Sequence, residues 1–221
     1  MASDDWVLRL VRGRQQLSRE QDVTSARVQL LDGLARAMAE NGYARTSVAD
    51  IAARAGFTSD EFYAQFADIE SCFLAAYDLG IEVLATTVQD SLGSADRPPL
   101  VRLDRLLASY LDVLATEPAF ARTFLIEVYA AGPRALERRM EALRRFAALF
   151  AEILAPTETS DGTLDPFICE AIVGAISSVV TTRVAEGKFD QLPALREPIM
   201  GFVRRLLETA PPAGFEPATT A

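Results

Sequence analysis

One segment constrains the fold more than any other part of the chain: SVADIAARAGFTSDEFYAQF, residues 47–66. It contains two short helical patterns that meet at Gly56, a residue type able to adopt the positive φ that ends a helix. Each pattern opens with a hydroxyl residue and an acidic residue three positions later, the capping-box spacing: Ser47 with Asp50, and Thr58 with Glu61. Two short helices joined in this way predict a helix-turn-helix, whose second helix is shaped to enter a DNA major groove.

The composition supplies enough apolar material for a core. With 221 residues, half of them hydrophobic, the chain forms either one large domain or a small domain fused to a larger one. No apolar run reaches the roughly 18 residues that a membrane-spanning helix needs. The N-terminus MASDDW lacks the basic start and the cleavable apolar stretch of a signal peptide. We therefore expect a cytoplasmic protein.

The charge balance argues against a nucleic-acid partner, but only for the chain as a whole. The net charge is −9 and the pI is about 4.7, whereas proteins that bind nucleic acid usually carry a basic surface. Residues 1–66 hold eight arginines against nine acidic residues, which leaves a net charge of −1. Most of the acidic excess therefore lies outside the helix-turn-helix, and DNA binding is weakened as a prediction without being excluded.

Little in the sequence suggests catalysis. The chain has no histidine, and so lacks both the usual general base near neutral pH and the commonest metal ligand. Cys72 and Cys169 fit no metal spacing, and we expect two buried apolar residues rather than a redox-sensing pair. No nucleophile motif and no glycine-rich phosphate loop occurs. We predict no enzyme, no metal and no cofactor; a carboxylate-based enzyme is the alternative, with candidate acids Glu117, Glu127 and Glu170.

Helical periodicity runs along the chain without a strand pattern, which predicts an all-α protein. Outside the helix-turn-helix, helices are expected at about 24–41, 68–91, 100–115, 118–131, 134–154, 166–187 and 195–207. The domain organisation that follows is a flexible arm over 1–22, a helix-turn-helix domain over 23–67, a helical domain over 68–209 and a disordered tail over 210–221. In the arm, Arg12 and Arg14 flank Gly13, a pairing suited to a flexible strand along phosphates or in a minor groove; the alternative is a solvated tail.

Residues 28–78 closely resemble the N-terminal domain of TetR-family transcriptional regulators. Five features carry the resemblance, in the right order: an amphipathic first helix, the NGY corner at 41–43, the TSVADIA second helix, the FY..F recognition helix, and the E..F.AAYD opening of the next helix. The resemblance implies an N-terminal three-helix DNA-binding domain followed by a C-terminal helical ligand-binding and dimerisation domain. It also implies a homodimer, because two recognition helices must reach half-sites about 34–36 Å apart on a palindromic operator.

The resemblance places the DNA contacts at the start and outer face of the recognition helix and at the start of the helix before it. Tyr63 is the strongest candidate, because Phe62 and Phe66 face inward and leave its hydroxyl for a phosphate. The sequence departs from the family where basic or small residues are common, with Asp60 in the recognition helix and Ile69 in place of a lysine. The expected DNA-binding residues are Arg12, Arg14, Arg45, Ser47, Thr58, Ser59, Asp60, Tyr63 and Gln65.

The C-terminal helices supply candidates for a sensor pocket and for a dimer interface. Aromatic side chains with a few polar anchors suit an apolar pocket, although any helical core has a similar composition. The expected ligand-binding residues are Tyr110, Phe120, Phe124, Glu127, Phe146, Phe150 and Phe167. Small residues in 166–187 and the apolar face of the last helix suggest pairing with a second copy, the alternative being burial in the chain's own core. The expected interface residues are Gly174, Ser177, Ser178, Thr181, Ile199, Phe202 and Leu206.

These observations predict a ligand-responsive transcriptional repressor that a small apolar effector releases from its operator. The effector would favour one position of the 68–91 helix and so alter the spacing of the two recognition helices. The alternative is a TetR-like helical dimer with lost or weak operator binding, which acts through a ligand or a protein partner. The acidic recognition helix and Ile69 favour that alternative.

Overall fold

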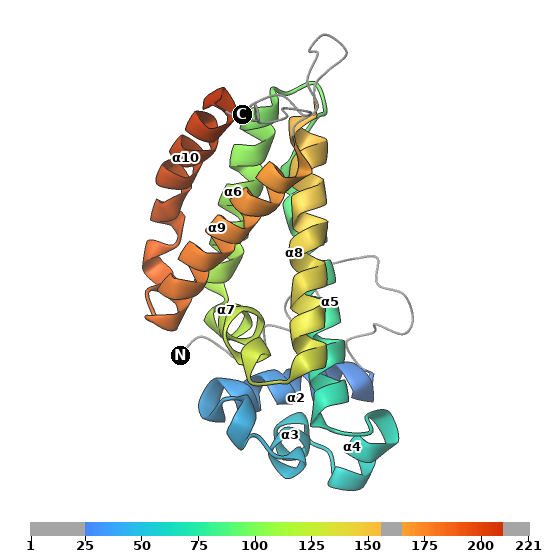
Figure 1. Ribbon diagram of the computed structural model, residues 1–221. Coiled ribbons are helices and arrows are strands. Elements are labelled where there is room, and N and C mark those ends of the chain that lie inside the picture. The colour runs from blue at the N-terminus through green and yellow to red at the C-terminus, as the bar shows by residue number, and fades with distance from the viewer. Residues whose placement is uncertain (1–24, 156–164, 210–221) are drawn as a thin grey trace, which may run out of the picture.

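The computed structural model describes residues 25–155 and 165–209, and every regular element within them is a helix (Figure 1). The all-α prediction is thereby confirmed for this part of the chain. The predicted arm with Arg12 and Arg14 and the predicted tail over 210–221 lie outside the described residues. Figure 1 shows the short N-terminal helices at one end of the molecule and the long C-terminal helices extending away from them.

The N-terminal domain consists of α2 (Ala26–Asn41), the 3-10 turn η2 (Tyr43–Arg45), α3 (Val48–Ala55) and α4 (Ser59–Gln65). Its core contains fully buried Leu30, Leu34, Ile51 and Phe62. Helices α2 and α3 cross closely at Gly33, where an added Cβ would lie 2.6 Å from the carbonyl oxygen of Ile51. A side chain at Gly33 would therefore push the two helices apart.

Helix α5 (Ile69–Ser91) connects the N-terminal domain with the C-terminal helices. It begins with a capping box in which the backbone N–H of Ser71 donates to the Asp68 carboxylate at 2.7 Å. Phe73, Tyr77 and Ile81 are buried along its length. Because this one continuous helix packs against both parts of the molecule, a shift of α5 would change the packing in both.

The remaining helices are α6 (Pro99–Thr116), α7 (Pro118–Leu125), α8 (Pro133–Leu154), α9 (Pro166–Ala185) and α10 (Arg196–Thr209), with 3-10 turns η3 (Glu127–Tyr129), η4 (Phe189–Gln191) and η5 (Pro193–Leu195). A proline stands in the first turn of α6, α7, α8 and α9, where the missing N–H has no helical partner to lose. These prolines explain why the starts of the four helices were readable from the sequence, whereas the helix expected over 118–131 ends at Leu125 and is followed by η3.

Helix α7 lies between the two parts of the molecule and packs against α2 (Figure 1). The ring of Phe124 also covers Gly80 of α5, where an added Cβ would lie 2.0 Å from Cζ. Phe124 stacks on Phe120 at 4.2 Å and on Tyr77 at 4.8 Å between ring centroids. Helix α7 therefore joins α2, α5 and the interior of the C-terminal helices.

Two helices, α5 and α9, are long and apolar enough to cross a membrane when judged by length and composition alone. Helix α5 is the central helix of the fold, and most of its apolar side chains contact other helices. Helix α9 is buried on one side only. The apolar character of these helices thus belongs to a packed core and, on α9, to an exposed face described below.

Candidate functional site

The helix-turn-helix is held by the two capping boxes that the sequence predicts. The Asp50 N–H donates to the Ser47 hydroxyl at 3.2 Å, and the Ser47 N–H donates to the Asp50 carboxylate at 3.0 Å. At the start of α4, the Thr58 N–H donates to the Glu61 carboxylate at 2.7 Å. Gly56 has the left-handed φ of 79° at the end of α3. These contacts fix where each helix begins and how the chain turns between them.

Helix α4 turns its aromatic face inward and its polar face to solvent. Phe62 and Phe66 are buried, with ring centroids 5.7 Å apart, whereas 58% of Tyr63 is exposed. Arg45, Ser47, Thr58, Asp60 and Gln65 are exposed and Ser59 is half-buried, so the predicted DNA-binding residues within the described part of the chain lie at the start of α3 and along α4, largely open to solvent. The outer face of α4 and the start of α3 are therefore polar.

The carboxylates of this surface are largely committed to capping and ion pairs. Hydrogen bonds from the backbone and side chain of Thr58 lower the pKa of Glu61, and those from Ser47 lower the pKa of Asp50. Glu61 is thus a cap, as predicted, which leaves Asp60 as the acidic side chain of α4 outside the capping box. Its carboxylate faces solvent at the position where the resemblance expects contact with DNA.

The arginines of the N-terminal domain lie close to acceptors of their own. Arg54 pairs with Glu40 and with Asp50, and Arg36 pairs with Asp32 at 2.7 Å. The Arg45 guanidinium donates to the carbonyl of Asn41 at 2.9 Å, an exposed contact that phosphate could replace at small cost. Arg27, also exposed, donates to the carbonyl of Gln65 at the end of α4 at 3.0 Å.

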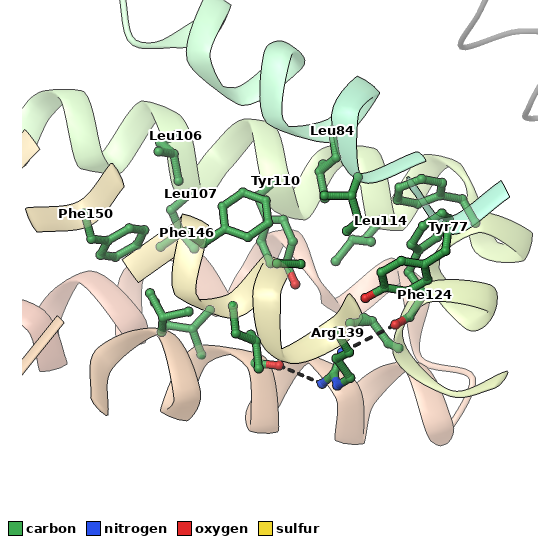
Figure 2. Close-up of a pocket in the computed structure, with 18 residues that line it drawn as sticks. Tyr77, Leu84, Leu106, Leu107, Tyr110, Leu114, Phe124, Arg139, Phe146 and Phe150 are labelled. Atoms are coloured by element: carbon green, nitrogen blue, oxygen red, sulfur yellow. Dashed lines mark hydrogen bonds between the residues drawn. The ribbon is translucent and has the colours of Figure 1, made fainter. Parts of the chain in front are cut away.

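An apolar pocket lies among the C-terminal helices (Figure 2). The cavity between these side chains has a volume of about 70 Å³, which is smaller than a typical small-molecule site, so a ligand would need the lining side chains to move apart. Five of the predicted residues line it: Tyr110, Phe120, Phe124, Phe146 and Phe150. The other lining residues come from α5 to α9 and are Tyr77, Ile81, Leu84, Leu106, Leu107, Leu114, Leu125, Arg139, Ala142, Leu143, Val173, Ile176 and Ser177.

Two residues predicted for the pocket lie elsewhere. Glu127 sits in η3 and faces the N-terminal domain, where its carboxylate accepts the backbone N–H of Tyr43 at 2.8 Å. Phe167 is 71% exposed on the outer side of α9, because it shares a helical face with Gly174, one heptad on, rather than with buried Ile172. Both predictions were therefore wrong, and the reason is helix register: each side chain points away from the cavity.

The sequence analysis missed the one charged residue of the pocket, Arg139. Its side chain is 6% exposed and donates to the Ser177 hydroxyl at 2.9 Å, to the Tyr129 hydroxyl at 3.2 Å and to the Phe124 carbonyl at 3.4 Å. Figure 2 shows it at one end of the pocket, with Phe150 at the other. Its position could have been inferred from the sequence spacing, because Ala135, Arg139 and Ala142 recur at i, i+4 and i+7 and lie on one buried face of α8.

Burial governs the titration of the pocket hydroxyls. It raises the pKa of Tyr77 to about 12, although the nearby Arg139 guanidinium opposes the shift. Burial also raises the pKa of Tyr110. Both hydroxyls therefore remain neutral donors near neutral pH, and Arg139 is the only formal charge among the residues that line the pocket.

The residues predicted for a dimer interface divide into two groups. Gly174, Ser178 and Phe202 are exposed, and Thr181 and Leu206 are half-buried. Ser177 and Ile199 are each 7% exposed, so their placement in an interface was wrong. Ser177 faces the pocket and accepts from Arg139, and Ile199 packs into the core, because each lies on the inward stripe of its helix.

Both cysteines are buried free thiols, as predicted. Burial raises the pKa of each thiol, so neither has the thiolate character that a redox sensor needs. Within the described residues, no cluster of side chains is suited to hold a metal ion.

The comparisons with known proteins agree with this geometry. Residues 30–76 match the family model described as "Bacterial regulatory proteins, tetR family". No curated protein matches the chain in sequence. Two similar solved structures are the fatty acid degradation regulator FadR of Bacillus halodurans (20% identity, 86% of this chain and 96% of that one, TM-score 0.70) and FadR of Bacillus subtilis in complex with stearoyl-CoA (20%, 85% and 98%, 0.65).

A third similar structure is the multidrug-binding protein EbrR complexed with malachite green (20% identity, 84% of this chain and 98% of that one, TM-score 0.65). At these identities the likeness shows a shared fold. The family model matches over the α2–α5 segment that carries the capped helix-turn-helix. The N-terminal part of the chain is thus similar to TetR-family regulators, and the chain as a whole shares the fold of the solved structures named above.

Proposed function

We propose that this protein is a cytoplasmic, homodimeric repressor that binds a palindromic DNA operator and leaves it when a small molecule occupies the pocket. The observation that carries the proposal is the exposure of Tyr63 on a doubly capped α4 whose Phe62 and Phe66 are buried. An inward aromatic anchor and an outward polar face are what a recognition helix needs to dock in a major groove.

The second part of the proposal is the dimer. Phe167, Val179 and Phe202 are 71%, 42% and 39% exposed, and all three lie on α9 and α10. The small residues Gly174 and Ser178 would let a helix of a second copy approach α9 closely. An added Cβ at Gly174 would have no atom of this chain within 4 Å. Pairing of these two helices with those of a second copy would cover the apolar face and supply the second recognition helix.

The third part is the response to a ligand. FadR of Bacillus subtilis and EbrR, which share this fold, have been solved with stearoyl-CoA and malachite green. The pocket is walled by α5, and Tyr77 and Ile81 contribute to both its lining and the core beside the N-terminal domain. A ligand that binds one position of α5 more tightly would shift the spacing of the recognition helices.

The charge of α4 favours a second candidate function, a TetR-like dimer that acts through a ligand or a protein partner without an operator. Helix α4 (SDEFYAQ) carries no cation, and its first turn holds Asp60 and Glu61. Ile69 is the first residue of α5, at the position where the resemblance leads us to expect a lysine that binds a DNA phosphate. Each missing phosphate contact makes the slope of log K against log[salt] less steep by about 0.9.

Binding to DNA decides between the two functions. Fluorescence anisotropy would compare DNA from the gene's own upstream region with scrambled DNA across a salt series, using protein shown to be dimeric by sedimentation. Specific binding that survives about 0.15 M salt supports the repressor. A folded dimer that prefers neither DNA at any salt concentration contradicts operator binding in that region and favours the partner-binding function.

A further inference from the structure

We propose that the effector is an amphipathic anion: an apolar tail fills the pocket, and a carboxylate or similar group binds the guanidinium of Arg139. This inference rests on the proposed ligand-binding function and names the chemical class of the ligand. It is carried by an arginine that is almost fully buried in an otherwise apolar pocket and has only neutral partners in the described structure.

An arginine keeps its charge at every accessible pH, and a buried charge is costly unless an opposite charge accompanies it. Three N–H groups of Arg139 are directed to neutral oxygens, those of Ser177, Tyr129 and Phe124. The face of Tyr129 adds a weaker contact, 5.2 Å from the guanidinium carbon to the ring centroid. Among the described residues, no carboxylate forms an ion pair with Arg139, and we assign its counter-charge to a bound ligand.

A polar groove next to the pocket, between α5 and α8, holds the acidic side chains Asp78, Glu82 and Glu141. Asp78 and Glu141 both pair with Arg138, at 3.5 Å and 3.3 Å. The groove shares Tyr77, Ile81 and Ala142 with the pocket wall. Arg138 and Arg145 also line this groove, so its carboxylates have cations beside them, whereas no side chain of the described residues forms an ion pair with Arg139.

The rest of the pocket suits a hydrocarbon or aromatic tail. From Arg139 the lining continues through Tyr110 and Phe146 to Phe150, and Figure 2 shows these rings between the arginine and the opposite end. Tyr110 and Ser177 bring hydroxyls to the lining, and that of Ser177 accepts a hydrogen bond from Arg139. A guanidinium with adjacent hydroxyls recognises a carboxylate through charge-assisted hydrogen bonds, which are stronger than neutral ones.

Three probes with the same tail test the assignment: decanoate, decan-1-ol and decyltrimethylammonium, each titrated into the full-length dimer by calorimetry below its micelle concentration. We expect decanoate to bind about tenfold more tightly than decan-1-ol, since its carboxylate can accept charge-assisted hydrogen bonds from the guanidinium, which are stronger than those to a neutral hydroxyl. The cationic probe should bind most weakly, because its charge has the sign of Arg139.

Two variants locate the effect. Arg139→Gln should abolish the preference for decanoate while decan-1-ol binds as before, and Arg139→Lys should retain the order of the three probes. Should Arg139→Gln fail to fold, the three probes with the unaltered protein and with Arg139→Lys still decide the question. Measured heat-induced unfolding of each variant shows whether the fold is kept.

The outcomes separate this inference from the proposed function. Equal affinity of the unaltered protein for decanoate and decan-1-ol overturns the role of Arg139 and leaves the apolar pocket in place. An order in which the cation binds best also overturns it. Binding of none of the three probes removes the pocket as a ligand site and, with it, both the inference and the ligand-responsive part of the proposed function.

Discussion

The carboxylate of Glu127 accepts a hydrogen bond from the backbone N–H of Tyr43, 84 residues earlier in the chain, at 2.8 Å. Tyr43 lies in η2 between α2 and α3, and its ring makes an edge contact with Phe73 of α5, 5.4 Å between centroids. Glu127 is in η3, two residues before Tyr129, whose hydroxyl accepts from Arg139 in the pocket. The N-terminal domain is thus linked to the pocket by a short chain of contacts.

Removal of this link should loosen the N-terminal domain. In Glu127→Ala we expect the amide of Tyr43 to exchange with solvent faster and the free energy of unfolding to fall by about 1 kcal/mol, because the contact is only partly buried. Glu127→Gln keeps an acceptor oxygen and is the matched control, with less than half of the loss. Hydrogen exchange at the Tyr43 amide measures the effect, and unchanged exchange in Glu127→Ala would show that the link carries no stability.

A second prediction concerns the close approach of α5 and α7. Gly80→Ala would place a methyl group 2.0 Å from the Phe124 ring, and we expect a loss of about 1–3 kcal/mol from overpacking. Gly201→Ala in α10 is the control: its nearest neighbour is a terminal nitrogen of the flexible Arg205, 3.5 Å away, so helix propensity should make it neutral or stabilising.

Urea unfolding measures both variants of this pair, and a third variant tests the cause. If the clash with the ring explains the loss, then Gly80→Ala combined with Phe124→Leu should be less destabilised than the sum of the two single changes. Additive losses would mean that Gly80 matters for a reason other than its contact with Phe124.

The local signals of the sequence proved more informative than the apolar periodicity. Both capping boxes and the positive φ of Gly56 formed as predicted, because each depends only on neighbours within one turn. The two faces of the 166–187 segment were not separable, because α9 is apolar on its buried side at Ile172 and also on its exposed side at Phe167. Which side meets the core depends on α8, and that is tertiary information.

The same limit explains why Arg139 was missed. Apolar periodicity in the 134–154 segment favours Met140 rather than Arg139 for the buried face. In the structure Met140 is 46% exposed and Arg139 is buried, one position away. The buried face of α8 is therefore shifted by one residue from the face that apolar periodicity favours, and the guanidinium lies inside. Its hydrogen-bond partners, Ser177 and the Phe124 carbonyl, are 38 and 15 residues away in the sequence. No local pattern reports such partners.

A third prediction tests the recognition helix. Tyr63→Phe removes only the exposed hydroxyl and should weaken binding to operator DNA about fivefold, since one hydrogen bond contributes about 1 kcal/mol. The fold should be unaffected, because the ring keeps its edge contact with Phe62, 5.6 Å between centroids. Anisotropy with labelled DNA measures affinity, and sedimentation checks the dimer. Equal affinity of Tyr63→Phe and the unaltered protein would remove this hydroxyl from the DNA contacts.

A fourth prediction tests the exposed face of α9. Gly174→Glu adds a charge where nothing lies within 4 Å, so the single chain should fold as before while the proposed dimer dissociates. Ala148→Glu is the control, because Ala148 is exposed on a side of α8 that already carries Arg144, Arg145 and Glu152. Sedimentation at several concentrations distinguishes the two. A Gly174→Glu protein that stays dimeric would place the interface on another surface.

The last prediction concerns alkaline pH. Burial raises the pKa of the Tyr77 hydroxyl from 10.0 to about 12 and raises the pKa of the Cys72 thiol above 9.0. At a pH above these unshifted values the unfolded chain has lost protons that the folded chain still binds. The contribution of these two groups to the free energy of unfolding is therefore fully present below about pH 9 and falls as the pH rises. For Tyr77 alone the loss at about pH 11 is about 1.4 kcal/mol. Urea unfolding at about pH 8 and about pH 11 measures it, and Tyr77→Phe should show a fall smaller by about that amount. A free energy of unfolding that rises over this interval, or an equal fall in Tyr77→Phe, would contradict the burial of this hydroxyl as the cause.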